Sequence, residues 1–248
     1  MSVTEALHFS QWVKKTFVSQ QVLSEQTRLA AVGTGAAVLA HEIGNPLNNM
    51  FLQAQLLRRL LRKKNENGDK LMEYLNNVTS EIRRLAELLK EFRCFSRDQR
   101  LTRKPASISD LIINVLSANK PLFECSRIDV AADLPRNLPS VAMDSGKITQ
   151  VLVNLFKNAI ESMSTGGTIS VSAEACDHSV TVVVSDTGDG VPANVDVFEP
   201  FQTTKSQGTG LGLPIAKQIV TAHGGTISCE NNCDQGARFT IVLPLAVK

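Results

Sequence analysis

Apolar residues recur every three or four positions along two long stretches in the first third of the chain. The first run is Ala36, Ala40, Ile43, Leu47, Met50, Ala54, Leu57 and Leu61, and the second is Leu71, Leu75, Val78, Ile82, Leu85, Leu89 and Phe92. An apolar period of about 3.5 residues is typical of helices that pack together as a supercoiled bundle. The polar residues 63–70, which include Gly68, predict a turn between the two helices.

These runs predict a helical hairpin over residues 29–103, preceded by a lead-in helix or linker over residues 1–28. The first helix is expected over about residues 22–62, and Arg103, Lys104 and Pro105 are expected to end the second. Each Leu or Ile left in water forgoes roughly 1.5–3 kcal/mol. Two hairpins side by side would cover both stripes as a four-helix bundle, so we expect a homodimer. The alternative is that the rest of the chain covers the hairpin.

One histidine lies beside the apolar seam of the first helix. His41 follows Ala40, a seam position, and is therefore expected on the flank of the seam and reachable from solvent. Pro46 lies five residues further on, where it removes a backbone donor and should kink the helix. Taken alone, His41 fits an ordinary surface histidine better than a nucleophile.

The pattern changes at residue 104 and predicts a second domain over residues 104–248, in which helices and strands are mixed. Helices are expected over residues 108–118, 144–163 with Asp144 as the N-cap, and 209–222. Strands are expected over residues 127–131, 168–175, 179–185, 226–229 and 238–243, the second and third as a hairpin. Helices with antiparallel strands indicate the α+β class and a two-layer sandwich.

Three segments of this domain carry side chains or backbone suited to a nucleotide. Asn154 and Asn158 lie four residues apart on one helix face, where they would suit Mg²⁺ with phosphates, or else are an ordinary exposed pair. In residues 186–190, a carboxylate at a strand end could accept a hydrogen bond from the amine of adenine. The glycines beside it would let the backbone approach the ligand closely; the alternative is a tight turn. Residues 208–213 would cradle phosphate at a helix N-terminus.

The composition limits the kinds of molecule that this chain is expected to bind and the compartment in which it is expected. The net charge is +2 and only 5% of the residues are aromatic, so no basic face or base-stacking platform for nucleic acid is expected. The five cysteines are odd in number and scattered, which argues against a disulfide framework. Cys229 and Cys233 lack the second ligand pair of a metal site. Neither a membrane-spanning run nor a signal peptide is evident, so a cytoplasmic location is expected.

Read in order, these motifs resemble those of the sensor histidine kinases of two-component systems. Residues 41–47 look like the H box, 154–158 the N box, 186–190 the first glycine box, 198–205 the F box and 208–213 the second glycine box. The resemblance spans about residues 29–244. It implies a dimeric hairpin that carries the histidine, followed by the GHKL-type (Bergerat) ATP-binding sandwich shared with DNA gyrase and the heat-shock chaperone ATPases.

The resemblance implies a protein-histidine kinase that uses ATP and Mg²⁺, phosphorylates His41 and passes the phosphoryl group to an Asp of a response regulator receiver domain. It makes Glu42 the acid/base and Asn45 the residue that orients water in a reverse phosphatase reaction. It makes Asn158 the metal ligand and Asp186 the partner of adenine. The implied ATP-binding residues are Asn154, Lys157, Asn158, Asp186, Gly188, Gly190, Thr203, Thr204, Lys205, Gly208, Thr209, Gly210, Leu211 and Gly212.

The chain departs from the family pattern at three places. Gly44 stands where Arg or Asn is common, and Gln202 replaces a common Phe. The resemblance implies a mobile lid over ATP across residues 189–207, and its segment 191–197 is short. Residues 1–28 are too few for a sensor domain, so the chain is expected to be either a naturally minimal kinase or an excised core. An upstream sensor domain or protein is one candidate partner. The alternatives in function are a protein-serine kinase or ATPase of the same superfamily, separable by the acid stability of the product, and a degenerate, non-catalytic dimeric scaffold.

Overall fold

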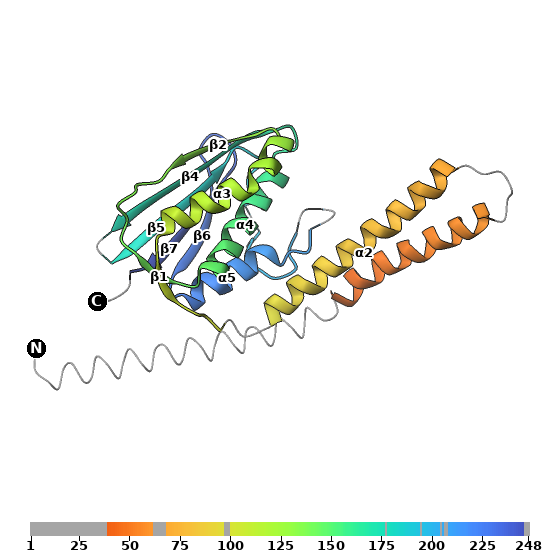
Figure 1. Cartoon of the computed structure of the whole chain (residues 1–248), viewed down its shortest axis with the longest axis horizontal. Coiled ribbons are helices and arrows are strands. Elements are labelled where there is room, and N and C mark those ends of the chain that lie inside the picture. The colour runs from red at the N-terminus through yellow and green to blue at the C-terminus, as the bar shows by residue number, and fades with distance from the viewer. Residues whose placement is uncertain are drawn as a thin grey trace, which may run out of the picture. The chain divides into compact units, whose positions relative to one another are not determined.

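The chain folds into two compact units that divide after Ser96, one helical and one of mixed helices and strands (Figure 1). The computed structural model describes residues 39–61, 68–96, 100–176, 178–193, 195–203, 205 and 208–245. The expected lead-in over residues 1–28 and the start of the first helix therefore lie outside the described residues.

The helical unit is the expected hairpin. Residues 39–61 form one helix, which continues through the buried Pro46, and α2 spans Gly68–Ser96. Two polar contacts join the helices in antiparallel order: Asn49 Nδ2 donates to Glu81 Oε1 at 3.2 Å, and Arg84 Nη2 lies 3.9 Å from Glu42 Oε2. The kink at Pro46 stays a prediction.

Most of the heptad stripe of this unit remains in contact with solvent. Leu88 and Phe95 of α2 are buried, each with 2% of its surface exposed. Several large apolar side chains on both helices keep between 43% and 72% of their surface exposed: Leu47, Leu61, Leu75, Ile82 and Leu89 of the predicted stripes, and Phe51, Leu52 and Met72 outside them. The two helices therefore do not cover their own apolar stripes.

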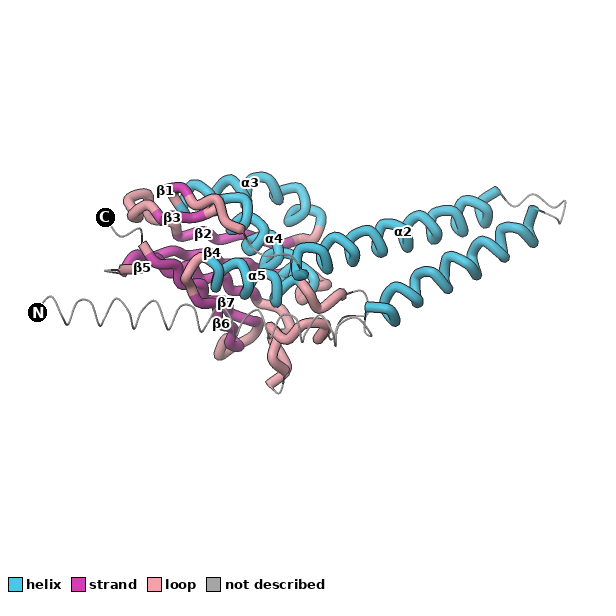
Figure 2. Tube along the Cα trace, turned by 90° about the horizontal axis from the view of Figure 1, so that it is seen from below, coloured by secondary structure: helices cyan, strands magenta, loops and turns pink. Residues whose placement is uncertain are grey.

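The second unit is a two-layer sandwich built on a five-stranded sheet. The strand order is β2-β4-β5-β7-β6, which can be followed across the sheet in Figure 2. Only the pair β2 and β4 is parallel. The strands are β2 Ile128–Asp133, β4 Gly167–Cys176, β5 Ser179–Asp186, β7 Ala237–Pro244 and β6 Thr226–Asn231, and β1 Lys104–Ala106 pairs with β3 Val141–Met143 in a separate two-stranded sheet.

Three helices cover one face of the sheet: α3 Ile108–Cys125, α4 Ser145–Glu161 and α5 Gly212–Ala222 (Figure 1). Buried and half-buried residues alternate along β5, so one of its faces points into the core. The core contains Val180, Val182, Val184, Ile169, Val171, Phe239, Ile241, Ile148, Leu152, Leu155, Phe156, Ile215 and Ile219. The α+β sandwich expected from the sequence is confirmed.

Several expected boundaries were wrong. α3 continues past residue 118 to Cys125 and contains Pro121, because Phe123 is buried and stacks edge-on against Phe156 of α4 at 5.8 Å. The parallel pairing of β2 was not expected, nor were β1 and β3, which at three residues each are too short for a period to show. The second helix ends at Ser96 rather than near residue 103.

The segment before β1 is instead bonded into the sandwich. Thr102 N–H donates to Asp144 Oδ2 at 2.9 Å, and the Arg103 guanidinium donates to the carbonyl oxygen of Ala222. Asp144 is the N-cap of α4, as predicted, and its Oδ1 accepts from Lys147 N–H at 3.2 Å. These N–H donors, Thr102 foremost, lower the pKa of the Asp144 carboxyl.

A buried histidine joins α5 to the start of α4. The His223 side chain, 2% exposed, has Nδ1 2.7 Å from the carbonyl oxygen of Ile219 and Nε2 3.0 Å from the backbone nitrogen of Asp144. Nδ1 therefore carries the proton, and Nε2 accepts from the Asp144 N–H. Burial, with smaller opposing contributions from Ile219 and Asp144, lowers the pKa of His223 below its ordinary value of 6.5.

We predict that His223 makes the sandwich less stable in mild acid. Above pH 6.5 the imidazole is neutral in both folded and unfolded chains, and its contribution is complete. As the pH falls below 6.5 the unfolded chain binds the proton first, so the free energy of unfolding decreases until the lowered folded pKa is passed. Urea unfolding at several pH values checks this.

The variant His223→Gln should cost about 1–3 kcal/mol at neutral pH and lose less stability than wild type on acidification. His178→Gln, at an exposed position of the β4–β5 turn, is the matched control and should keep the wild-type pH dependence. If His223→Gln loses as much stability on acidification as wild type does, another group is responsible for the pH dependence.

Candidate functional site

The H-box residues lie on the helix over residues 39–61. His41 and Asn45 are both exposed and lie one helical turn apart, so they share a face. Glu42 is half-buried, and its ion pair with Arg84 of α2 orients it toward the second helix. This arrangement presents His41 to solvent, as the sequence predicted, and anchors its neighbour Glu42 within the hairpin.

Asp186 ends β5, in the middle of the sheet, and only 5% of its surface is exposed. Its Oδ1 accepts two backbone hydrogen bonds, from Gly188 N–H at 2.9 Å and Ala237 N–H at 3.2 Å. Two fixed donors on one oxygen hold the carboxylate in a single orientation. A rigid acceptor at the end of a central strand can recognise a donor on a ligand.

Asn154 of α4 contacts the second glycine segment. Its Nδ2 donates to the carbonyl oxygen of Gly212 at 2.8 Å, which fixes the start of α5 against α4. A Cβ at position 212 would lie 3.8 Å from the Asn154 amide. Asn154 therefore positions the segment that the sequence predicts for phosphate.

Asn158, one turn further along α4, contacts the F-box lysine. Lys205 Nζ lies 3.3 Å from Asn158 Oδ1, 3.5 Å from the Asn158 carbonyl oxygen and 2.7 Å from Glu161 Oε2. The Asn158 amide oxygen already faces a cation in this arrangement. Glu161 completes the cluster, and sequence reasoning missed it; its place three residues after Asn158 was the available signal.

Ser162, one further turn along the chain, touches the first glycine segment. A Cβ at position 188 would collide with Ser162 Oγ, so only glycine lets the backbone after β5 approach α4 this closely. Residues 154, 158 and 162 are spaced by four and lie on one helix face. This face of α4 thus brings the second glycine segment, the F-box lysine and the first glycine segment together.

The segment before α5 has a tightly folded backbone. Gly210 has φ of +65°, and a Cβ there would lie 2.6 Å from the carbonyl carbon of Phe201. Phe201 N–H donates to the Gly210 carbonyl at 3.0 Å, and Leu211 N–H to Thr209 Oγ1 at 3.3 Å. The N-cap Leu211 has no polar side chain, so the first N–H groups of α5 can meet an anion.

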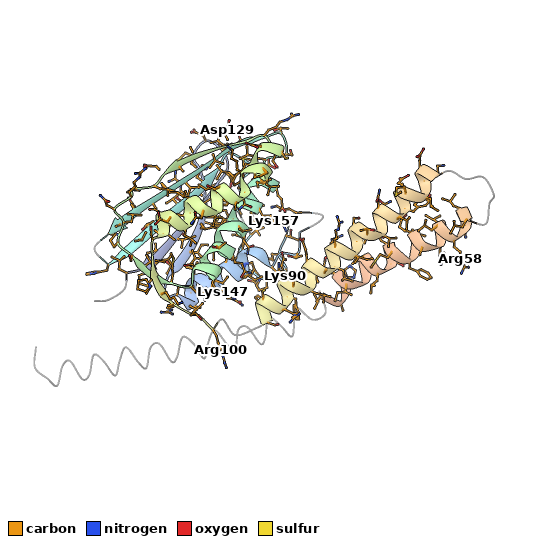
Figure 3. All side chains as sticks on the ribbon, viewed as in Figure 1. Arg58, Lys90, Arg100, Asp129, Lys147 and Lys157 are labelled. Atoms are coloured by element: carbon orange, nitrogen blue, oxygen red, sulfur yellow. The ribbon has the colours of Figure 1, made fainter. Side chains whose placement is uncertain are left out.

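The remaining predicted residues fall into four groups. Thr203 Oγ1 accepts from Lys205 N–H at 3.1 Å, and Gly208 packs on Thr203 Oγ1. Gly190 has φ of +74° in the turn after Asp186. Lys157 is exposed on α4, three residues after Asn154 (Figure 3). Thr204 lies outside the described residues.

The donor set fits a magnesium ion held chiefly by phosphates and water. Asn158 Oδ1 is a neutral oxygen ligand of the kind Mg²⁺ accepts, and a cation already lies beside it. Within the described part of the chain, no cluster of three or more His, Cys, Asp or Glu could hold a metal ion alone. The residues present would therefore contribute to a metal–nucleotide site rather than to a closed protein cage.

Two further residues of this region were missed by sequence reasoning. Asn231 ends β6 and Asn232 begins the turn to β7. Asn231 bonds to the backbone of Val191, after β5, and Asn232 bonds to the Asp186 carbonyl at the end of β5. The pair of asparagines was visible in the sequence only as a turn signal. Their partner strand could not be read from local pattern.

The cysteines play no part in cross-linking this site. All five are free thiols. Burial, followed by the nearby carboxylates of Asp186 and Glu230, raises the pKa of the Cys229 thiol to about 12. It therefore remains a thiol at neutral pH. Separately, none of the helices in the described ranges is both long and apolar enough to cross a bilayer.

Two family models match the two units of the chain. Residues 33–100 match the His Kinase A (phospho-acceptor) domain. Residues 143–247 match the family described as histidine kinase-, DNA gyrase B-, and HSP90-like ATPase. Both matches include the predicted motifs, His41 in the first and Asn154 to Gly212 in the second.

The chain is also similar to curated and solved histidine kinases. It is 31% identical over 242 residues to the sensor histidine kinase ZraS of Escherichia coli O157:H7, covering 95% of this chain and 52% of that protein. The chain thus spans about half the length of this curated relative.

Two solved structures carry the comparison into three dimensions. Histidine kinase ThkA in complex with response regulator protein TrrA has a TM-score of 0.76 at 28% identity, covering 93% of this chain and 66% of that one. The catalytic domain of ThkA alone has a TM-score of 0.52 at 33% identity, covering 59% of this chain and 96% of that one. The chain belongs to the sensor histidine kinases of two-component systems.

Proposed function

We propose that this chain is an ATP-dependent protein-histidine kinase that phosphorylates His41 and then passes the phosphoryl group to an Asp of a response regulator. The observation that carries the proposal is the face of α4 at residues 154, 158 and 162, on which two glycine segments and Lys205 meet. We assign the phosphoacceptor role to residues 29–103 and ATP binding to residues 104–248.

Asp186 would recognise the base. Its Oδ1 is occupied by two backbone donors, so we assign Oδ2 to the exocyclic amine of adenine. An ionised carboxylate only accepts hydrogen bonds, so it favours a base that presents an amine at this point. Gly188 and Gly190 let the backbone after Asp186 pass close to Ser162 and Asn231, which shapes the loop beside this carboxylate.

Asn158, Lys205 and the first turn of α5 would hold the phosphates. Mg²⁺, when bound, supplies neutralisation of the charge on the β- and γ-phosphates. Asn158 Oδ1 would be its protein ligand, and the Lys205 ammonium would move from Asn158 and Glu161 onto phosphate oxygens. Asn154 carries an amide, which cannot take a proton from water, so the site favours transfer over hydrolysis.

His41 would be the nucleophile. A ring nitrogen forms a bond to the γ-phosphorus while the bond from that phosphorus to the bridging oxygen breaks, which releases ADP. Glu42 would take or orient the proton on the other ring nitrogen, and its ion pair with Arg84 steadies the carboxylate for this role. The solvent exposure of His41 supports access by both the nucleotide and a partner.

The partner would be a response regulator receiver domain. The similar kinase ThkA has been crystallised with the response regulator protein TrrA, which supports this class of partner. Phosphohistidine would lose its phosphoryl group to a carboxylate oxygen of the regulator. Asn45 is exposed one turn from His41 and would orient water for the reverse phosphatase reaction.

Replacing His41 should abolish labelling and spare nucleotide binding. His41→Gln incubated with γ-labelled Mg-ATP should incorporate no label, because the amide is not a nucleophile at phosphorus, while ATP affinity stays at the wild-type value. The control His178→Gln should label normally, with label that is lost in acid as phosphohistidine requires. Persistent labelling of His41→Gln would refute the assignment, and acid-stable label would indicate a serine kinase instead.

Replacing Asp186 should weaken ATP binding. Asp186→Asn loses the charged acceptor for the adenine amine, and a lost charged hydrogen bond lowers affinity by at least about tenfold. Calorimetry with Mg²⁺ and a non-hydrolysable ATP analogue measures this. Asp129→Asn, at an exposed position on β2 (Figure 3), is the control of identical chemistry and should bind as wild type. Equal affinity in both variants would contradict the role of Asp186.

The exposed apolar stripe supports a homodimer. Ile82 of α2 is 53% exposed, and a second hairpin would cover it in a four-helix bundle. We predict that Ile82→Glu shifts the protein from dimer to monomer in sedimentation velocity, because a charge in the seam is costly to desolvate. Ile113→Glu, at a 47% exposed position of α3, is the control and should leave the dimer intact. A dimeric Ile82→Glu variant would exclude this seam.

A further inference from the structure

The turn between β6 and β7 lies against the segment that follows β5. In the sheet, β7 pairs with both β5 and β6, so this turn and the last residues of β5 lie at the same end of the strands. Neither Asn231, the last residue of β6, nor Asn232, the first residue of the turn, has a part in the function proposed above. Both nevertheless bond to the chain between Ser185 and Val191.

Asn231 pairs with the backbone of one residue in that segment. Its Oδ1 accepts from Val191 N–H at 2.7 Å, and its Nδ2 donates to the Val191 carbonyl at 2.8 Å. A side-chain amide offers the same donor and acceptor as a peptide group. Asn231 therefore extends the hydrogen bonding of β6 to a segment that is outside the sheet.

Asn232 bonds to the end of β5 itself. Its Nδ2 lies 2.9 Å from the Asp186 carbonyl oxygen and 2.9 Å from Ser185 Oγ, and its Oδ1 lies 3.1 Å from the same Oγ. Nδ2 also donates to the Gln235 carbonyl at 3.1 Å within the turn. One side chain thus bonds to both the turn and the residue that carries the proposed base-reading carboxylate.

The backbone of the turn reaches the same carboxylate directly. Ala237 N–H, just after the turn, is one of the two donors to Asp186 Oδ1. Gly236 has φ of +92°, and a Cβ there would collide with the Asp186 carbonyl oxygen. A Cβ at Gly190 would lie 2.8 Å from Asn231 Oδ1. The end of β6 and the turn that follows it therefore pack closely on the segment from Asp186 to Gly190, with contacts at Asn231, Gly236 and Ala237.

We propose that Asn231 and Asn232 are positioning residues of the nucleotide site, which hold Asp186 and the segment up to Val191 in the geometry that recognises the adenine amine. The inference rests on the proposed assignment of Asp186 to adenine. Without the asparagines, the carboxylate would keep its charge and its place in the strand. It would lose the fixed distance to the base on which discrimination depends.

The test compares ATP with inosine triphosphate, which carries an oxygen in place of the exocyclic amine. Dissociation constants of both nucleotides with Mg²⁺ are measured by calorimetry on the full chain. Wild type should prefer ATP by at least about tenfold, because the Asp186 carboxylate accepts from the amine and repels the oxygen. In Asn231→Ala and Asn232→Ala this preference should fall about five- to tenfold.

A loss of stability alone would lower the bound fraction for both nucleotides and leave their ratio unchanged. Asp234→Ala, at an exposed position of the same turn, is the matched control and should keep the wild-type ratio. Asn231→Asp keeps the acceptor for Val191 N–H and loses the donor, so its ratio should be intermediate. If Asn232→Ala does not fold, Asn231→Ala and Asn231→Asp, both at an exposed position, decide the question.

Each outcome has one meaning. Wild type that binds both nucleotides equally would overturn the assignment of Asp186, and with it the proposed base recognition. Wild type that prefers ATP, with asparagine variants that keep the full preference, would overturn this inference alone. A change in Asp234→Ala as large as that in Asn231→Ala would likewise overturn it, since the effect would then belong to the turn as a whole.

Discussion

The site depends on one face of α4. Asn154 bonds to Gly212, Asn158 to Lys205, and Ser162 packs on Gly188, at successive turns of the helix. The buried residues of α4, from Ile148 to Ala159, fix this helix against the sheet. Segments that are far apart in the chain therefore meet because a single rigid helix carries a contact for each.

The hairpin of β6 and β7 also holds Asp186 in place. Gly188 N–H, in the first glycine segment, and Ala237 N–H, at the start of β7, both donate to Asp186 Oδ1. Asp186 Oδ2, the oxygen assigned to adenine, can then be held in place without any direct hydrogen bond to α4. Glycine is needed where these backbones come closest, at Gly188 and Gly236.

Periodic and local signals predicted much of this molecule. The heptads gave the hairpin, the alternation along residues 179–185 gave the central strand, and Asp144 gave the start of α4. The order of the motifs indicated Asn158, Asp186 and Lys205. Three features depend on distant partners and carry no local pattern: the parallel pairing of β2, the ion pair of Glu161, and the bonds of Asn231 and Asn232.

The most direct test of this account is a crystal structure of the chain with Mg²⁺ and a non-hydrolysable ATP analogue. We predict that the adenine amine donates to Asp186 and that the metal is bound to Asn158 Oδ1. We also expect that Lys205 has left Asn158 and Glu161 for the phosphates. A nucleotide bound away from α4, with Lys205 still on Asn158, would contradict it.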